Sequence, residues 1–322
     1  MKPFLAPIAA VMLLASAIPV LAQTYPNRVI KVIAPNPPGG VGDLIARTFG
    51  DYVTSQTGQP VVIENRSGAN GNIAWEATAK SPPDGYTIGL VNTGVIINKF
   101  MFKTLPYDVY RDLAPVAPIG AAPQLFFISA KLPPKTLPEF VAYAKAQTRK
   151  LTYASAGIGS TVHLAGSELS LRTGTNLVHV PYRGVAPAIT DVIADHVDSI
   201  AVSIGPIRGA VDAGAVRPLF SLTPKRLSYF PDVPASPEVG LAGLDMSTWF
   251  ALMAPRDTPT AIVERLNALA RGMQADPTAQ KRLATSRLEP MVMTTAEFAA
   301  FLKAEGPKWQ DAVRKAGIVA ME

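Results

Sequence analysis

The chain has 322 residues, no cysteine and three histidines, and its 30 basic and 24 acidic residues give a net charge of +6. A chain without cysteine has no disulfide, no thiolate metal site and no lipid-bearing N-terminal cysteine. The basic residues are spread along the sequence, whereas nucleic-acid-binding proteins usually gather them in a stripe. We therefore expect no nucleic-acid partner and only a weak preference for anions.

Residues 1–22 are predicted to be a signal peptide. Lys2 gives a positive start, residues 3–22 carry no charge, and Val20 and Ala22 are small residues of the kind that a signal peptidase prefers. Cleavage after Ala22 would leave 29 basic and 24 acidic residues, a net charge of +5. An uncleaved membrane anchor is the alternative, but Pro19 and the small residues near the end favour cleavage. We expect a protein exported to a periplasm.

Short apolar runs of strand type alternate with helical patterns along the rest of the chain. The predicted strands are Arg28–Ala34, Val61–Asn65, Thr87–Val91, Leu125–Ser129, Leu151–Ala154, Leu177–Pro181, Ser199–Ser203, Val216–Leu222 and Thr248–Met253. The predicted helices are Asp43–Gln56, Asn72–Lys80, Leu137–Gln147, Thr161–Arg172, Ala186–His196, Ile207–Ala213, Ala261–Gln274 and Ala296–Ala316. This alternation predicts an α/β fold of mostly parallel sheets with helices on both faces.

About 300 residues are more than one ordinary core holds, so we expect two lobes. Two proline-rich segments, 107–126 and 216–239, are predicted to carry the chain from one lobe to the other and back. The first lobe would then comprise residues 23–106 and 223–322, and the second would comprise residues 107–222. A ligand cleft is expected between them.

A stiff and then flexible elbow follows the first predicted strand, with the sequence APNPPGGVGDLIAR at residues 34–47. Pro37 and Pro38 end the strand because they lack a backbone donor. Gly39 and Gly40 let a ligand approach the backbone closely. The helix that opens near Asp43 then presents free N–H groups and the positive end of its dipole to an anion.

A second elbow, LTYASAGIGSTVHLAGSEL, occupies residues 151–169 and falls in the other predicted lobe. A strand again runs into glycines, Gly157 and Gly159, and Ser160 is a good helix N-cap with Thr161 beside it. Ligands of open α/β sheets bind outside the carboxyl ends of the strands, so both elbows should face the cleft. Two ordinary structural turns are the alternative, but one elbow per lobe favours ligand binding.

The ordered motifs of the chain resemble the Bug-type solute receptors of tripartite tricarboxylate transporters, over about residues 25–318. The motifs that carry the resemblance are Gly39-Gly40-x-x-Asp43-x-x-Ala46-Arg47, Val62-Ile63-Glu64-Asn65-Arg66 with Gly68, Pro83-Asp84-Gly85-Tyr86-Thr87, Leu105-Pro106-Tyr107-Asp108, Tyr153-Ala154-Ser155 with Gly157-x-Gly159-Ser160, His163-Leu164-Ala165-Gly166, His179-Val180-Pro181-Tyr182-Arg183-Gly184, Trp249, Ala254-Pro255 and Trp309. Each motif is weak alone, but the ordered set is specific.

The resemblance implies a two-lobed, type II periplasmic binding fold that closes on a small carboxylate, held largely by backbone groups and waters. The ligand-binding residues that we expect on this basis and from the elbows are Pro38, Gly39, Gly40, Val41, Asp43, Asn92, Thr93, Ser155, Ala156, Gly157, Gly159, Ser160, Thr161 and Arg183. The chain departs from the family at Asn36, where an aromatic residue is usual, and at Trp75, where a small residue is usual. For Trp75 we favour helix packing over a compensating role in the pocket.

Several side chains have a structural reading beside the functional one. Asp43 is as well suited to ordering its helix as to contacting a ligand. Arg183 either binds a carboxylate or covers the surface of its lobe, and Asn92 and Thr93 follow a strand that ends at the cleft. His163 is predicted to be structural, and no histidine pair has the spacing of a metal site.

Catalysis is not expected. Gly40-Val41-Gly42 begins a dinucleotide fingerprint, but Ile45 stands where the third glycine would be. The sequence has neither a G-x-S-x-G elbow nor a P-loop lysine. We predict a monomeric receptor without a cofactor or metal, which captures a small carboxylate, such as a di- or tricarboxylate, and delivers it to inner-membrane transporter subunits. The alternative is a ligand-sensing protein that docks on the ectodomain of a sensor kinase.

Overall fold

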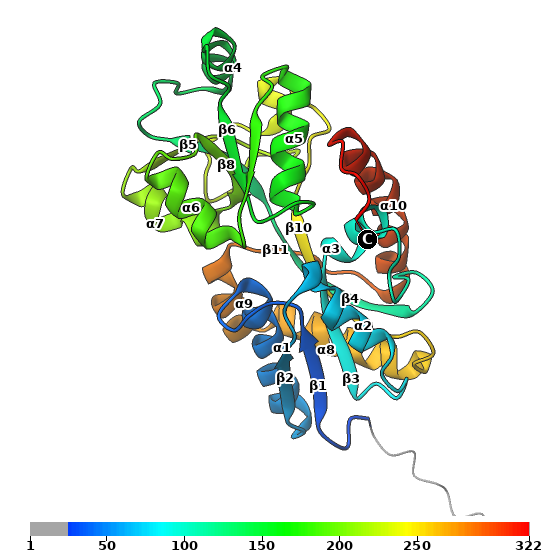
Figure 1. The fold of residues 1–322 in the computed structure, drawn as a ribbon. Helices are drawn as coiled ribbons and strands as arrows, with labels where there is room; N and C mark the ends of the chain where they lie inside the picture. The colour runs from blue at the N-terminus through cyan, green and yellow to red at the C-terminus, as the bar shows by residue number, and fades with distance from the viewer. Residues whose placement is uncertain (1–24, 322) are drawn as a thin grey trace, which may run out of the picture.

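The computed structural model describes residues 25–321, and the predicted signal peptide lies outside them. The described chain forms two α/β lobes, one above the other in Figure 1. The first lobe is built on a six-stranded sheet with the order β11-β4-β10-β3-β1-β2, and the second on a five-stranded sheet with the order β7-β6-β8-β5-β9. The predicted two-lobed α/β fold is therefore confirmed.

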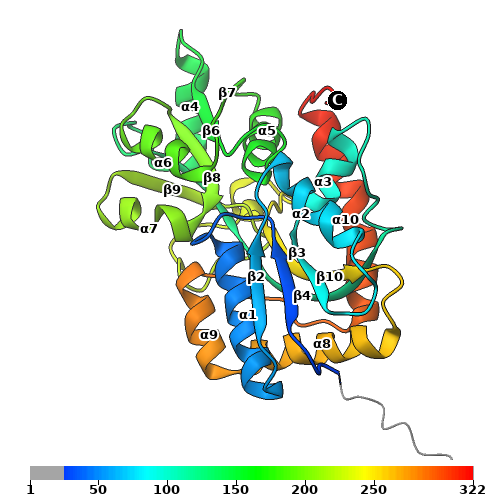
Figure 2. The ribbon, with the colours of Figure 1, turned by 60° about the horizontal axis from the view of Figure 1, so that its bottom comes forward.

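The first sheet consists of β1 (Ile30–Ala34), β2 (Val61–Asn65), β3 (Thr87–Asn92), β4 (Leu113–Ala122), β10 (Thr248–Pro255) and β11 (Glu289–Pro290). Its helices are α1 (Val41–Thr57), α2 (Asn72–Ala79), α3 (Gly94–Met101), α8 (Thr260–Ala275), α9 (Pro277–Leu283) and α10 (Thr295–Lys315). In β1, Ile30, Val32 and Ala34 pack toward α1 and α8, whereas Ile33 joins the cluster that includes α2, α3 and α10. This alternation follows from the two-residue period of a strand. Helices cover both faces of the sheet (Figure 2).

The second sheet consists of β5 (Gln124–Ser129), β6 (Thr152–Ser155), β7 (Val178–Pro181), β8 (Ser199–Ser203) and β9 (Val216–Ser221). It is flanked by α4 (Leu137–Ala146), α5 (Thr161–Thr173), α6 (Val185–Ile193) and α7 (Ile204–Asp212). Among the described residues, three short 3-10 helices complete these elements: η1 (Ala69–Gly71), η2 (Ser236–Val239) and η3 (Ala284–Ser286).

Both sheets are mixed, which corrects the expectation of mostly parallel sheets. Of the nine strand pairings in the described chain, four are parallel: β1 with β2 and β3, and β6 with β7 and β8. The other five are antiparallel because β10 lies between β3 and β4, β11 pairs with β4, and β5 lies between β8 and β9. The parallel strands are nevertheless those that carry the elbows.

The sequence predicted that residues 107–126 cross from one lobe to the other. This is wrong, because residues 113–122 form β4 and pair with β10 in the first sheet. The chain passes to the second sheet at Pro123, between the end of β4 and the start of β5. Helices α3 and α9 were also not predicted.

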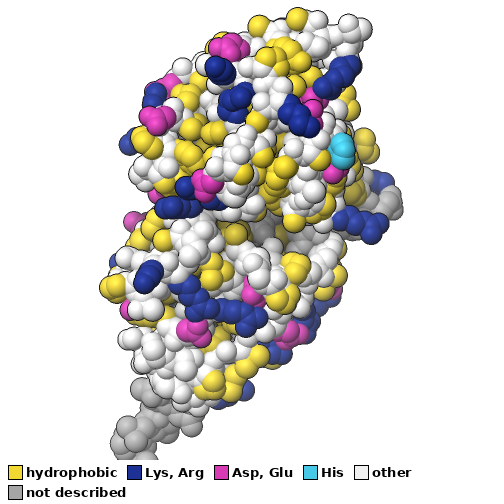
Figure 3. Space-filling view, turned by 90° about the vertical axis from the view of Figure 1, so that its left-hand side faces the viewer, with side chains coloured by type: hydrophobic (Ala, Val, Ile, Leu, Met, Phe, Trp, Pro, Cys, Tyr) yellow, Lys and Arg dark blue, Asp and Glu magenta, His cyan; other side chains and the backbone are white. Residues whose placement is uncertain are grey.

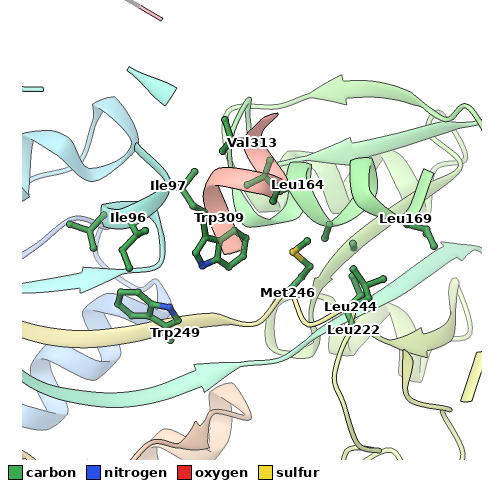
Figure 4. Packing of buried hydrophobic residues seen from close by; sticks show 14 of the residues in the cluster. Ile96, Ile97, Leu164, Leu169, Leu222, Leu244, Met246, Trp249, Trp309 and Val313 are labelled. Atoms are coloured by element: carbon green, nitrogen blue, oxygen red, sulfur yellow. The ribbon is translucent and has the colours of Figure 1, made fainter. Parts of the chain in front are cut away.

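The largest hydrophobic cluster joins the two lobes. Trp309 and Val313 of α10 pack with Ile96 and Ile97 of α3 and with Leu164 of α5, which lies in the second lobe (Figure 4). Separate clusters fill the rest of each lobe. On the face shown in Figure 3, by contrast, the surface is hollowed between the two lobes.

Candidate functional site

The two predicted elbows lie at the same level of the molecule, where the chain crosses between the sheets. Strand β3 ends beside Phe250 of β10, which in turn pairs with Gly120 near the end of β4. In the second sheet, Ser203 at the end of β8 pairs with Gln124 at the start of β5. The carboxyl ends of the parallel strands therefore point toward the crossing from both sides, the position where open α/β sheets bind ligands.

The first elbow is held by Asp43, whose side chain is only 6% exposed. One carboxylate oxygen accepts hydrogen bonds from the N–H of Gly39 (3.0 Å) and from Nε of Arg47 (2.9 Å). The other accepts one from Nδ2 of Asn65 (3.0 Å). Burial would raise the pKa of Asp43, but the hydrogen bonds from Arg47, Gly39 and Asn65 outweigh it and lower the pKa. Both oxygens of Asp43 thus order the loop.

The donors left at this elbow are those of the first turn of α1. The first intrahelical bond runs from the N–H of Leu44 to the oxygen of Gly40 (3.0 Å), so the N–H groups of Val41 and Gly42 precede the helical ladder. Gly40 has an ordinary extended conformation (φ −77°), whereas Gly39 adopts φ +87°. The anion-attracting groups of this elbow are therefore backbone donors and the helix dipole.

The second elbow has the same design but is held by different side chains. Ser160 is the N-cap of α5, and its Oγ accepts a hydrogen bond from the N–H of His163 (3.1 Å). The N–H of Gly157 donates to Oγ of Ser155 (3.1 Å), and the N–H of Gly159 donates to Nδ1 of His163 (3.0 Å). The first intrahelical hydrogen bond runs from the N–H of Leu164 to the oxygen of Ser160 (3.0 Å). The N–H groups of Thr161 and Val162 come before it and therefore have no acceptor within the helix.

Ser155 and His179 form a pair that superficially resembles a nucleophile and its base. Oγ of Ser155 lies 2.6 Å from Nε2 of His179, a spacing that such catalytic pairs share. Ser155 is fully buried, however, and its Oγ also accepts the N–H of Gly157. The pair therefore fixes the loop, and Ser155 lies behind the elbow.

The predicted polar residues Asn92, Thr93 and Thr161 lie along the crossing. Asn92 Oδ1 accepts the N–H of Gly94 (2.8 Å), and Thr93 Oγ1 accepts the N–H of Trp249 (2.9 Å). Oγ1 of Thr161 lies 2.7 Å from Oγ1 of Thr248. Each of these side chains thus already has a partner within the fold.

Sequence reasoning missed Gln124 and Thr248, two further polar residues at the crossing that bond to Thr161. Gln124 Nε2 donates to Thr161 (2.9 Å) and Thr248 (3.3 Å), and so links α5 to the first residue of β10. The side-chain oxygen of Gln124 is buried without a hydrogen-bond partner among the described residues. No local pattern marks these two positions, because only the crossing of the strands brings them together.

Two contacts between the lobes bring the first lobe to the second elbow. Asn70 Nδ2 donates to the oxygen of Ile158 (3.4 Å), and a Cβ on Gly159 would overlap Sδ of Met101. Arg183, by contrast, is exposed after β7. Trp75 is fully buried and donates to the oxygen of Leu90 (3.2 Å), as expected for helix packing.

The described residues suggest neither a metal centre nor a membrane span. Within residues 25–321, no cluster of three or more histidine or acidic side chains is placed to hold a metal ion. None of the helices in this range has both the length and the apolar character needed to cross a bilayer.

Solved structures with the same fold define the class. Rpa4515 of R. palustris, solved with adipate, has a TM-score of 0.83 at 31% identity and covers 92% of this chain and 100% of its own. MatC of Rhodopseudomonas palustris, solved with bound malate, has a TM-score of 0.77 at 30% identity, with 90% and 100% covered. The fold is thus that of two-lobed periplasmic binding proteins.

Sequence comparison then gives the family. The model of the tripartite tricarboxylate transporter family receptor matches residues 45–318. Protein BugT of Bordetella pertussis is 33% identical over 303 residues, which cover 94% of this chain and 93% of BugT. The chain belongs to the tripartite tricarboxylate transporter receptor family, whose members are periplasmic solute-binding proteins.

Proposed function

We propose that this protein is a receptor for a small dicarboxylate, which it binds between the two elbows. The single observation that supports the proposal is that each lobe has a glycine-rich helix N-terminus directly after a parallel strand, α1 after β1 and α5 after β6. Each helix N-terminus behaves as roughly +0.5 charge and stabilises a nearby anion by about 0.3–2 kcal/mol. A ligand with an anionic group at each end would satisfy both.

The donors that we assign to the ligand are the N–H groups of Val41 and Gly42 on one side and of Thr161 and Val162 on the other. The N–H groups of Gly39, Gly157 and Gly159 already have internal acceptors, so these glycines contribute shape and access. The surface next to these donors is assigned to Pro38, Gly40, Ala156 and Ser160. For an ion pair with a ligand carboxylate we assign the exposed Arg183, which follows β7.

Two relatives support the ligand class, since one was solved with adipate and another with bound malate. Membership of a transporter-receptor family supports delivery of the ligand to the membrane subunits of such a transporter after export and cleavage of the signal peptide. We assign no catalytic activity to this protein, because Ser155 is fully buried and its contact with the half-buried His179 holds the loop.

Thermal unfolding in the presence of candidate ligands tests the proposal. Adipate, malate, succinate and citrate should be compared in the absence of added metal. A ligand that binds only the native protein stabilises it by RT ln(1 + [L]/Kd), so the melting temperature should rise with its concentration. Dimethyl adipate, which keeps the carbon chain but lacks the charges, is the matched control and should have no effect. The proposal fails if the diester stabilises as well as adipate does, or if sugars stabilise and carboxylates do not.

A further inference from the structure

Three aromatic rings stack directly behind the second elbow. The imidazoles of His163 on α5 and His179 on β7 lie 3.8 Å apart between ring centroids, with an angle of 16° between their planes. The phenol ring of Tyr153 on β6 lies beside both imidazoles and nearly parallel to them, with its centroid 5.0 Å from that of His179 and 6.2 Å from that of His163. His163 is 6% exposed. The stack therefore joins three elements of the second lobe at the point where the elbow leaves β6.

The two histidines hold the two glycines of the elbow. Nδ1 of His163 accepts the N–H of Gly159, which requires that Nδ1 carry no proton. Nε2 of His179 lies 2.6 Å from Oγ of Ser155, and that oxygen accepts the N–H of Gly157. Gly157 and Gly159 adopt φ +120° and +75°. The left-handed glycines that shape the elbow are thus fixed through imidazole nitrogens.

A proton on Nδ1 of His163 would reverse this arrangement. The nitrogen would become a donor facing the donor N–H of Gly159, and a cation would stand against a stacked imidazole. The groups around the stack do not offset that charge. Tyr153 is a neutral phenol, the acidic Glu168 on α5 is paired with Arg172 (2.7 Å), and Tyr182 after β7 donates to Asp191 (2.6 Å). Lys315 of α10 approaches Glu168 at 3.6 Å.

We propose that the His163–His179 stack positions the second elbow for its ligand, and that protonation of His163 in acid releases the elbow and weakens binding. The inference rests on the proposed function, because the elbow is a binding element only if a ligand sits there. It assigns both histidines as positioning residues: each acts through a glycine or serine of the loop, behind the ligand.

The electrostatics of the stack place the transition in acid. Burial first, and then the charge of His179, lowers the pKa of His163 from 6.5 to about 4, and burial lowers the pKa of His179 to about 4. The folded, neutral stack is therefore the form present at neutral pH. A ligand that selects the neutral elbow lowers the pKa of His163 further, so its affinity should fall as the pH drops through about 4.

Adipate affinity of the full mature chain, measured by calorimetry from pH 7.5 to pH 3.5, tests the inference with three variants. In His163→Asn, an amide oxygen replaces Nδ1 as acceptor and does not titrate. In His163→Phe, the ring remains but the acceptor is lost. His196→Phe is the matched control, because His196 lies outside the stack, after the end of α6, and its side chain is 71% exposed. Protonation of adipate affects all four proteins equally and cancels in their ratios.

At pH 7.5 we expect His196→Phe to bind as wild type does. His163→Asn, which keeps an acceptor but loses the stacked ring, should bind more weakly than wild type, and His163→Phe, which loses the acceptor, should bind about threefold to tenfold more weakly, as for the loss of one hydrogen bond. Between pH 5 and pH 3.5 the affinity of wild type should fall more steeply than that of His163→Asn. Equal affinities and equal pH slopes in all four proteins would overturn the inference.

A second readout separates this inference from the proposed function. The amide resonance of Gly159 and the Nδ1 resonance of His163, followed by NMR in the wild-type protein without ligand, should titrate together in acid. If the two resonances titrate independently, the positioning role of His163 is overturned. This result does not depend on which ligand the protein binds. Failure of wild type to bind any carboxylate, with the coupled titration present, would instead overturn the proposed function alone.

Discussion

The side-chain oxygen of Asn36 lies against the α-carbon of Gly42, so closely that a Cβ on Gly42 would stand 2.1 Å from it. That oxygen is buried and has no hydrogen-bond partner among the described residues. The two residues belong to opposite ends of the first elbow, one before the prolines and one in the first turn of α1. The shape of this elbow therefore depends on the missing side chain at position 42.

Gly42→Ala should displace Asn36 and destabilise the protein by about 1–3 kcal/mol, the usual cost of overpacking. The free energy of unfolding in urea measures this effect. Asn36→Ala combined with Gly42→Ala should recover most of the loss, because the overlap with Asn36 is then removed and only the tight contact with Cδ2 of Leu90 (3.2 Å) remains. Gly40→Ala is the matched control, since a Cβ there would lie 3.5 Å from its nearest neighbour. Equal losses at positions 40 and 42 would contradict this account.

Gly40→Val should weaken ligand binding more than Ser160→Ala does. Position 40 has an extended conformation with room for a side chain, so the fold should survive while valine covers the N–H groups of α1. Ser160→Ala removes one helix cap and should cost about 0.5–2 kcal/mol of stability. Calorimetric titration of both folded variants with adipate provides the comparison. An unchanged affinity in Gly40→Val would remove the first elbow from the site.

Replacing Glu305 should destabilise the junction of the lobes without touching the elbows. Its buried carboxylate accepts the indole N–H of Trp249 (2.8 Å) and of Trp309 (2.7 Å). Glu305→Leu leaves both donors unpaired, at about 1–3 kcal/mol each. Glu305→Gln keeps an acceptor oxygen and should lose less. Chemical unfolding monitored by tryptophan fluorescence distinguishes the two, and equal losses would show that the hydrogen bonds contribute little.

Asp198 should make the protein sensitive to acid. Burial alone would raise its pKa, but hydrogen bonds from Arg149 (2.6 and 2.8 Å) and Thr152 (2.7 and 2.9 Å) outweigh burial and lower it below 3.8. A carboxylate with a lowered pKa in the folded state stabilises the protein above pH 3.8, and this contribution disappears as the pH falls through the folded pKa.

Asp198→Asn should therefore reduce stability at pH 7 and flatten its decline below pH 4, as measured by urea unfolding at each pH. Asp212→Asn serves as the control, because the side chain of Asp212 is 56% exposed in its pair with Arg208. The same acid slope in Asp198→Asn and wild type would assign the acid sensitivity to other groups.

Local patterns predicted most of the fold, and strand β4 shows why the rest was missed. Pro115 and Pro118 suggested an irregular crossing, since proline lacks the donor that a strand needs. In the structure, both prolines pair with β10 at its two register shifts, opposite Met253 and Ala251. Such irregularities relieve the missing hydrogen bonds, and they arise from the partner strand, about 130 residues away in the sequence, so no local window contains them.

The elbows could be predicted because their glycines, prolines and caps are adjacent in sequence. The N–H groups that stay available to a ligand could not be predicted, because this depends on which side chains of the folded chain accept the other N–H groups. His163 was expected to be structural, yet its stacking on His179 follows only from the pairing of β6 with β7. Gln124 reaches Thr161 and Thr248 in the same way, through the crossing of the chain.

The position of β10 between β3 and β4 also sets the order in which the protein can be completed. Strands β3 and β4 precede β10 in the chain, so a chain that ends before β10 lacks the strand that joins these two. All five strands of the second sheet lie between residues 124 and 221 and are available earlier. The second sheet therefore has all of its strands in a chain that still lacks the central strand of the first sheet. A mature chain truncated after residue 240 should protect residues 124–221 from protease while leaving β1 to β4 open to cleavage.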